Sequence, residues 1–156
     1  MKRLYWDACV FLSYVNGHVE RAPMIENVLQ DARDSQGLVE IVTATISLTE
    51  VAGGITVQGR TILTSEIEEK IDLLWADHSV VMLVELHQSI ALEARRLVRA
   101  AHDRAWQLKP MDAIHLATAV WIRASEFSTY DGGLKKYEDL IRMPIQEPFS
   151  PNRRLL

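Results

Sequence analysis

Four acidic side chains, far apart in the sequence, carry the clearest chemical potential of this chain. They are Asp7 at the end of the apolar opening MKRLYW, Glu50 in ISLTEV, Asp112 in KPMDAIHLATAV and Asp131 in FSTYD. Carboxylate oxygens are the ligands that hard divalent cations prefer in proteins. If the fold brings these four groups together, they form a cage for such a cation.

Each carboxylate also has a purely structural interpretation. Asp7 and Asp131 could cap the helices that follow them, an interaction that contributes about 1 kcal/mol. Asp112 follows Pro110 in a first helical turn, where a negative charge gains roughly 0.3–1 kcal/mol from the helix dipole. Glu50 is harder to explain in this way, because a buried unpaired carboxylate on a short apolar helix is costly. Four converging carboxylates would repel one another unless a cation neutralised them.

The elements that must position these residues alternate between strands and helices. The residue patterns predict strands at about 3–7, 39–43, 80–86, 126–130 and 143–146. They predict helices at about 8–15, 23–37, 45–52, 63–77, 89–107, 110–124 and 133–142, with Gly53 and Gly54 ending the helix that carries Glu50. This alternation indicates an α/β fold with a parallel sheet, in which ligand sites lie at the carboxyl ends of the strands. Asp7 and Asp131 are expected at two such ends.

Length and composition favour one globular domain in the cytoplasm. The 156 residues are 48 % hydrophobic and 24 % charged, which suits a single packed core. The single cysteine, Cys9, cannot form an internal disulfide, which fits a reducing compartment. The sequence has no apolar run of about 18 residues, so we expect a soluble protein without membrane association. The net charge of −4 argues against a surface adapted to indiscriminate nucleic-acid binding.

The expected ligand set limits both the metal and the reaction. Oxygen ligands select Mg²⁺ or Mn²⁺ over Zn²⁺, which favours imidazole and thiolate. Such ions activate water as a nucleophile and offset charge on a phosphoryl group. The sequence contains neither GxxxxGK[ST] nor GxGxxG, so the commonest nucleotide-binding folds are excluded. The chemistry therefore points to phosphodiester hydrolysis.

These motifs resemble the PIN domain family, and within it the VapC-type toxins of bacterial toxin–antitoxin pairs. The resemblance rests on the opening strand that ends at Asp7, Ser47 three residues before Glu50, the segment DAIHLATAV from Asp112, and Thr129 two residues before Asp131. It implies a three-layer α/β/α fold whose central parallel sheet has the strand order 3-2-1-4-5. It also implies that the four acidic residues bind Mg²⁺ or Mn²⁺ and are the catalytic residues.

By the same resemblance, the protein would be a metal-dependent endoribonuclease that hydrolyses RNA through a metal-activated water. It would be the toxin of a type II toxin–antitoxin pair, with a cognate antitoxin as partner, and would form a homodimer. The nuclease domain would span residues 1–147, followed by a C-terminal tail at 148–156. Two alternatives are a catalytically weak or inactive PIN module that binds RNA or protein, and an RNA-maturation nuclease without an antitoxin.

Several neighbours of the acidic residues have expected supporting roles. Ser47 and Thr129 are expected to orient carboxylates, although helix capping and strand propensity explain them equally well. Lys135 and Lys136 follow the last acidic residue closely and could bind an RNA phosphate, with a solvated helix face as the alternative. Cys9 stands where many relatives have Ser, Thr or Asn, and a thiol is a poor ligand for a hard ion.

Histidine, tryptophan and glycine residues complete the set of candidates. His115 lies one helical turn after Asp112, but Mg²⁺ seldom prefers imidazole, which favours a packing role. The tryptophans could stack on bases, yet their apolar neighbours favour core or interface packing; they are Trp6, Trp75, Trp106 and Trp121. Gly132 and Gly133 could let the backbone approach a phosphate, or could loosen the acidic residue before them.

Overall fold

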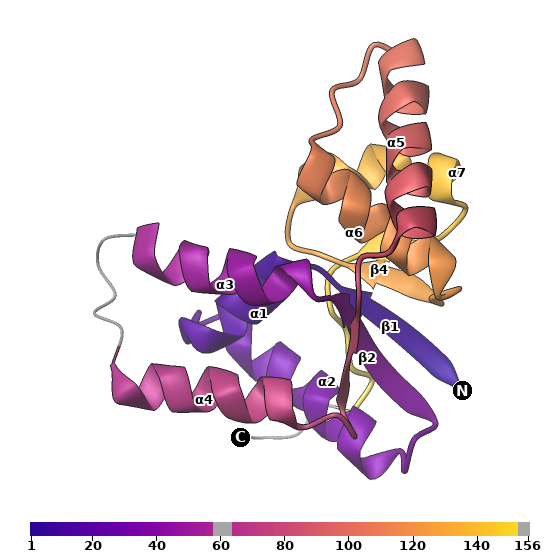
Figure 1. Ribbon diagram of the computed structural model, residues 1–156. Helices are drawn as coiled ribbons and strands as arrows, with labels where there is room; N and C mark the ends of the chain where they lie inside the picture. The colour runs from indigo at the N-terminus through magenta and orange to yellow at the C-terminus, as the bar shows by residue number, and fades with distance from the viewer. Residues whose placement is uncertain (58–63, 153–156) are drawn as a thin grey trace.

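The chain folds around one parallel sheet, as seen in a computed structural model that describes residues 1–57 and 64–152 (Figure 1). The strands are β1 (Lys2–Trp6), β2 (Val39–Ala44), β3 (Val81–Val84), β4 (Glu126–Ser128) and β5 (Ile145–Gln146). The strand pairings are parallel, and the order across the sheet is β3-β2-β1-β4-β5. The expected α/β class and strand order are therefore confirmed.

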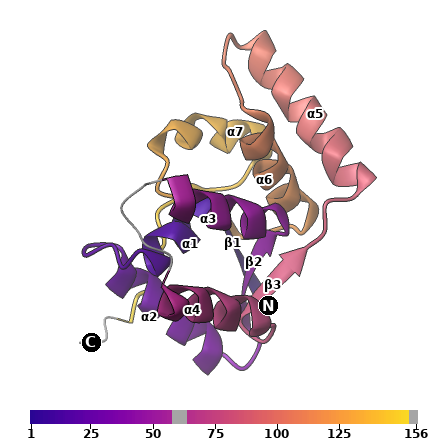
Figure 2. The same cartoon turned by 60° about the vertical axis from the view of Figure 1, so that its left-hand side comes forward.

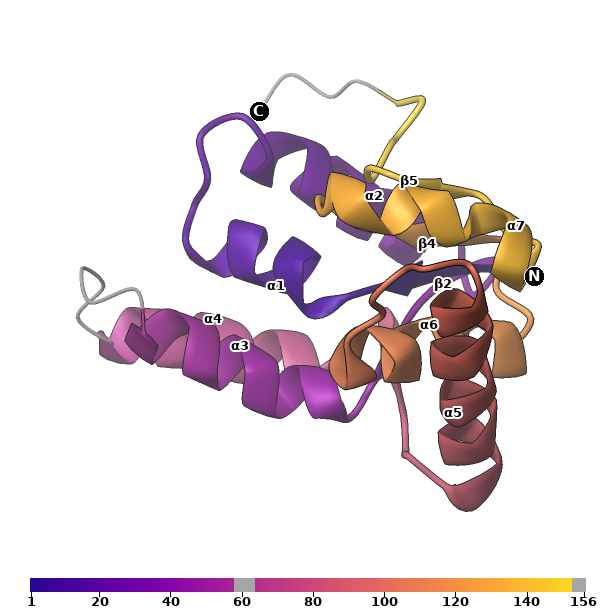
Figure 3. The ribbon, with the colours of Figure 1, turned by 90° about the horizontal axis from the view of Figure 1, so that it is seen from above.

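Helices cover the sheet in two groups. Within the described residues they are α1 (Ala8–Val15), α2 (Ala22–Asp34), α3 (Ile46–Val57), α4 (Ser65–Ala76), α5 (Gln88–Asp103), α6 (Pro110–Trp121) and α7 (Glu138–Ile141), with a 3-10 segment η1 (Gly132–Tyr137) before α7. Helix α1 packs against α2, α3 and α4, whereas α5 packs against α6 on the other side of the molecule (Figures 2 and 3). None of these helices is long and apolar enough to cross a bilayer.

Side-chain alternation along β1 builds a separate core on each face of the sheet. Tyr5 lies in one core with α5, α6 and α7. Leu4 and Trp6 point to the opposite face and pack with α1, α2 and α4. This is the period of two that any strand imposes on its side chains, and here both faces are apolar because both are covered.

The helix that carries Glu50 is longer than expected. Gly53 and Gly54 do not end it, because α3 continues to Val57. A Cβ atom at Gly54 would approach the methyl carbons of Leu12 to 2.7 Å. Gly54 therefore allows α3 and α1 to pack closely. The resulting contact outweighs the low helix propensity of glycine, which costs about 1 kcal/mol relative to Ala.

Helix α2 ends at Asp34 rather than near residue 37. Helices α5 and α6 also end earlier than expected, each for a local reason. Helix α5 ends at Asp103 rather than near residue 107, and α6 ends at Trp121 rather than 124. Ala105 and Arg123 have positive φ angles of 57° and 54°. The amides that follow them bond back to Ala101 and Ala119 in a left-handed cap, which satisfies the last carbonyls of each helix.

Other boundaries shift only slightly. The expected helix at 63–77 corresponds to α4 at Ser65–Ala76, and residue 63 lies outside the described residues. The expected helix at 133–142 is divided into η1 and α7. The expected strand at 126–130 ends at Ser128, so that Thr129 begins the connection that leads to Asp131.

The chain after β5 returns to α2. Ser150 is 2 % exposed, and its hydroxyl donates to a carboxylate oxygen of Asp31 on α2. The side-chain amide of Asn152 donates to the other oxygen of Asp31 at 3.0 Å. The backbone N–H of Ser150 also donates to the Met24 sulfur at 3.3 Å, so residues 148–152 are attached to α2 by several hydrogen bonds.

Candidate active site

One cavity of about 330 Å³ brings the expected acidic residues together. Its lining consists of Asp7, Ala8, Cys9, Leu12, Glu50, Asp112, His115 and Asp131. Asp7 follows β1 and Asp131 follows β4, which are adjacent in the sheet, while Glu50 comes from α3 and Asp112 from α6. The cavity therefore lies at the carboxyl ends of neighbouring strands, where the chain leaves the sheet in opposite directions.

Asp7 is the most deeply buried of these acids, with 6 % of its surface exposed. It stands at the N-cap position of α1 but makes no side-chain capping bond. Its Oδ1 instead accepts from the Cys9 thiol at 2.8 Å, and its Oδ2 accepts from the Thr129 hydroxyl at 2.6 Å. Burial raises the pKa of Asp7, although both hydrogen bonds favour the charged form. The capping interpretation therefore does not hold for Asp7.

Thr129 connects two of the acids. Besides donating to Asp7, its hydroxyl oxygen accepts from the backbone N–H of Asp131 at 2.9 Å. Asp131 is exposed, and its Oδ1 accepts from the backbone N–H of Gly133 at 2.9 Å. Capping thus does occur at Asp131, at the start of η1, and it fixes the carboxylate beside the cavity.

Asp112 lies in the first turn of α6, as expected. Its pKa is raised by burial first and by the negative charge of Asp131 second. Proximity of like charges in a partly desolvated cavity produces this kind of shift. A cation placed between the two carboxylates would reverse it.

Glu50 is held by a histidine whose role the sequence did not reveal. His115 Nε2 lies 2.5 Å from Glu50 Oε2, and His115 Nδ1 lies 2.8 Å from the hydroxyl of Tyr5. The ring is 2 % exposed, so the expected packing role is correct, but it also lines the cavity. The signal in the sequence was the spacing from Asp112, which puts both side chains on one helix face.

Cys9 supports Asp7. Besides donating to Asp7, the Cys9 sulfur accepts from the backbone N–H of Tyr130 at 3.2 Å. Burial, reinforced by the neighbouring carboxylate, raises the pKa of Cys9 to about 12, so the group is a thiol at neutral pH. Cys9 thus takes the place of a hydroxyl as a hydrogen-bond donor.

Ser47 is fully buried, and its hydroxyl forms a hydrogen bond with Thr43 of β2 rather than with a carboxylate. Its Oγ lies 2.7 Å from Oγ1 of Thr43, which donates to the carbonyl of Trp6 at 2.7 Å. Ser47 therefore ties the start of α3 to the ends of β1 and β2. Any influence on a carboxylate passes through the placement of α3.

The two expected RNA-binding lysines lie on η1 and contact protein groups. Lys135 forms an ion pair with Glu138 and donates to the carbonyl of Ile145 at 2.7 Å. The ammonium group of Lys136 lies 5.6 Å from the ring centre of Trp106 and 5.4 Å from that of Tyr137. Both side chains are exposed, and neither lines the acidic cavity.

The donor chemistry of the cavity fits a hard divalent cation. Its acidic groups offer oxygen atoms, and the raised pKa values of Asp7 and Asp112 show that uncompensated negative charge is unfavourable there. In the described part of the chain, no three acidic, histidine or cysteine side chains are already grouped as a metal site. Asp7, Glu50 and Asp131 are held by protein hydrogen-bond donors instead.

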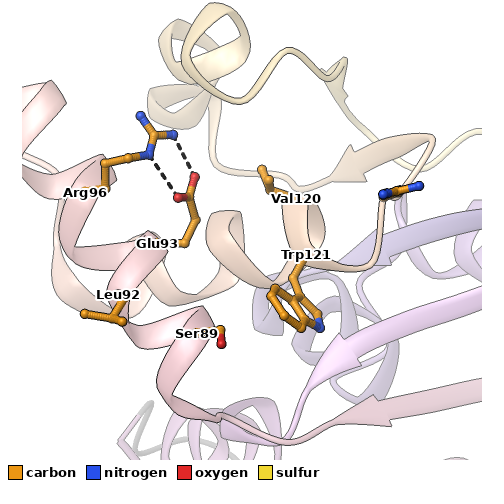
Figure 4. Close-up of a pocket in the computed structure, with 7 residues that line it drawn as sticks. Ser89, Leu92, Glu93, Arg96, Val120 and Trp121 are labelled. Atoms are coloured by element: carbon orange, nitrogen blue, oxygen red, sulfur yellow. Dashed lines mark hydrogen bonds and ion pairs between the residues drawn. The ribbon is translucent and has the colours of Figure 1, made fainter.

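A second hollow of the described surface lies elsewhere, between α5 and α6. It measures about 770 Å³ and is lined by residues including Leu92, Val120 and Trp121, beside a paired Glu93 and Arg96 (Figure 4). Trp121 is 51 % exposed and does not pack in the core, so interface packing stays the prediction for this tryptophan, whereas Trp6 is fully buried. With no cluster of carboxylates, this hollow is a poorer candidate for hydrolysis than the acidic cavity.

Solved structures with the same fold include components of toxin–antitoxin complexes. A chain of VapBC2 from Rickettsia felis, bound to a promoter DNA fragment, matches with TM-score 0.70 and 13 % identity, over 93 % of this chain and 98 % of that one. A toxin–antitoxin complex from Klebsiella pneumoniae matches with TM-score 0.57 and 20 % identity, over 94 % and 98 %. VapC20 from Mycobacterium tuberculosis, described as a sarcin-ricin loop cleaving toxin, matches with TM-score 0.58 and 16 % identity, over 83 % and 90 %.

At these identities, likeness to solved structures establishes the fold. No curated protein sequence matches the chain. The family is established by the sequence model of the PIN domain, which matches residues 4–140. This match spans most of the 156 residues and includes all four acidic residues of the cavity. The chain therefore belongs to the PIN domain family.

Proposed function

We propose that this protein is a metal-dependent endoribonuclease of the VapC type and the toxin of a type II toxin–antitoxin pair. The observation that carries the proposal is the convergence of Asp7, Glu50, Asp112 and Asp131 on one cavity. Stability does not require four acidic groups in this arrangement, since burial and mutual repulsion raise the pKa of Asp112. Such an arrangement is explained by a ligand of opposite charge.

The four acidic residues would hold Mg²⁺ or Mn²⁺. When bound, such a cation would offset charge on an RNA phosphodiester and make water a better nucleophile. Thr129 and Cys9 would keep both oxygens of Asp7 in place by hydrogen bonding. Asp131 is fixed by the amide of Gly133, on the exposed side of the cavity. The chain thus supplies an ordered set of oxygen ligands that the substrate can reach from one side.

RNA is the proposed substrate, and the protein would select it by shape rather than by overall charge. The net charge of −4 gives little general attraction to phosphates. Lys135 and Lys136 are exposed on η1, four and five residues after Asp131, and would contact the RNA backbone. The structural similarity to VapC20, a toxin that cleaves the sarcin-ricin loop, supports a structured RNA as the substrate class.

The proposed partners are a cognate antitoxin and a second copy of the chain, both in the cytoplasm. The antitoxin is supported by structural neighbours that come from toxin–antitoxin complexes. Its peptide would cover the acidic cavity and exclude RNA. A small adjacent gene for a DNA-binding protein, and co-purification of its product, would support this role, whereas an isolated gene would favour RNA maturation. Size-exclusion chromatography with light scattering tests the homodimer.

Cleavage of RNA by purified protein tests the activity. We expect ribosomal and transfer RNA to be cut in Mg²⁺ or Mn²⁺ and left intact in EDTA. The Asp112→Asn variant should lose cleavage, because it removes one charged ligand. Asp103→Asn is the matched control, since Asp103 is exposed at the end of α5, and this variant should cut like the wild type. Equal cleavage by wild type and Asp112→Asn would reject the mechanism, and binding without cleavage would favour the inactive PIN module.

A further inference from the structure

We propose that Tyr5 and His115 act together as positioning residues for Glu50. In this proposal, Tyr5 fixes the proton of the His115 ring on Nε2, and this N–H holds the Glu50 carboxylate at the cavity. The three side chains come from β1, α6 and α3, so the pair also sets where α3 stands relative to the sheet. The consequence for catalysis rests on the proposed function, whereas the position of the proton can be tested without it.

The backbone favours one direction for the hydrogen bonds of Tyr5. The N–H of Ala44 lies 3.1 Å from the hydroxyl oxygen of Tyr5, and a backbone N–H can only donate. The Tyr5 oxygen therefore accepts from β2. Its own proton is then free to donate to Nδ1 of His115, at 2.8 Å.

The state of the histidine ring follows from this direction. A neutral imidazole has one nitrogen that donates and one that accepts. If Nδ1 accepts from Tyr5, the proton resides on Nε2, which faces Glu50 Oε2 at 2.5 Å. The opposite tautomer would place a lone pair of Nε2 against the lone pairs of the carboxylate. The Tyr5 hydroxyl and the Glu50 carboxylate thus favour the same tautomer, and we infer that Tyr5 is needed to maintain it.

Packing keeps the pair rigid. Tyr5 is fully buried and stacks on Phe127, with ring centres 5.2 Å apart and planes at 20°. Its ring also meets His115 edge-on at 5.9 Å. The Glu50 side chain is 27 % exposed, so it can adopt several rotamers when nothing anchors it. A fixed donor at the base of the cavity selects one of them before any ligand binds.

Nuclear magnetic resonance of the metal-free protein tests the proton position directly. Two-bond ¹H–¹⁵N correlation separates protonated from unprotonated ring nitrogens, and the His115 signals are assigned by their loss in His115→Gln. We expect a proton on Nε2 and an unprotonated Nδ1. In Tyr5→Phe, which retains the stacked ring but lacks the hydroxyl, we expect the Nδ1–H form to appear. A proton on Nδ1 in the wild type would overturn the proposal.

Cleavage rates test the positioning role. His115→Leu should lower single-turnover cleavage about ten- to hundredfold, the usual effect of losing a group that orients a metal ligand. His115→Gln, whose amide can still donate to Glu50, should restore most of this loss. The matched control is His102→Gln, because His102 is exposed on α5, and this change should leave the rate unaltered.

A double-mutant cycle separates positioning from general destabilisation. Tyr5→Phe should slow cleavage when His115 is present. It should change the rate by no more than about twofold in the His115→Gln background, because glutamine has no tautomer to fix. If Tyr5→Phe lowers the cleavage rate by the same factor in both backgrounds, the two residues act independently and the proposed coupling is rejected. If no variant cleaves RNA, the proposed function fails, while the resonance experiment still decides the position of the proton.

Discussion

Replacing Thr129 by valine should weaken both the fold and the site, because its hydroxyl serves two acidic residues at once. Thr129 is 4 % exposed, donates to Asp7 Oδ2 at 2.6 Å and accepts from the N–H of Asp131 at 2.9 Å. Valine has almost the same shape, so Thr129→Val removes the hydrogen bonds without opening a cavity. The comparison therefore isolates the hydrogen bonds from packing.

The expected loss is about 2 kcal/mol of unfolding free energy at neutral pH, since a hydrogen bond to a charged group contributes roughly 1.5–3 kcal/mol. For a chain of 156 residues this corresponds to a melting temperature lower by about 4–8 °C. The hydrogen bond from Thr129 lowers the pKa of Asp7, so it stabilises the ionised form. The difference between the proteins should therefore shrink as pH falls through the pKa of Asp7 in the folded state.

Urea unfolding in EDTA, at neutral and acidic pH, measures this difference. The control is Ser35→Ala, because the Ser35 hydroxyl accepts from the N–H of Val39 at 2.9 Å, at the end of the sheet remote from the acidic cavity. This variant should lose about 1 kcal/mol without the same dependence on pH. Thr129→Val should also cleave RNA about ten- to hundredfold more slowly, unlike Ser35→Ala. Equal stability of Thr129→Val and wild type at neutral pH, or a loss unaffected by pH, would refute this account.

Three other changes have expected outcomes. Burial raises the pKa of Asp7 above its usual value of 3.8, so the folded protein loses stability as Asp7 ionises at higher pH. Without metal at neutral pH, Asp7→Asn should therefore have a higher melting temperature than the wild type. Equal melting temperatures would contradict this expectation. Mn²⁺ at a hundred times its dissociation constant should stabilise the wild type by about 2.7 kcal/mol, which thermal denaturation measures as a higher melting temperature. The same concentration should raise the melting temperature of Asp112→Asn far less. Equal increases in the two proteins would exclude Asp112 as a ligand. Ser150→Ala should cost about 1–2 kcal/mol in urea unfolding, because Ser150 is 2 % exposed and attaches residues 148–152 to Asp31, and should leave cleavage unchanged.

Much of the fold could be predicted from local patterns. Apolar runs such as those around Leu4 and Ile41 mark strands buried on both faces, and the helices between them require parallel pairing. The errors occurred where tertiary contacts override local preference. Gly53 and Gly54 were expected to end a helix, but Gly54 lies inside α3, where Leu12 packs against it.

By itself, the sequence determined which atoms are available for chemistry. It supplies acidic residues at the ends of elements and one thiol beside the first of them, and the alternation of elements was enough to predict that Asp7 and Asp131 share one edge of the sheet. These are consequences of residue type and of periodicity, which act over a few positions along the chain.

Only the tertiary structure decided which partner each acidic residue has. The contacts of Glu50 with His115 and of Asp7 with Thr129 join residues separated by 65 and 122 positions. No local pattern encodes such pairs, because they depend on how α3, α6 and the sheet pack. The burial created by that packing raises the pKa of Asp7 and favours a ligand of positive charge.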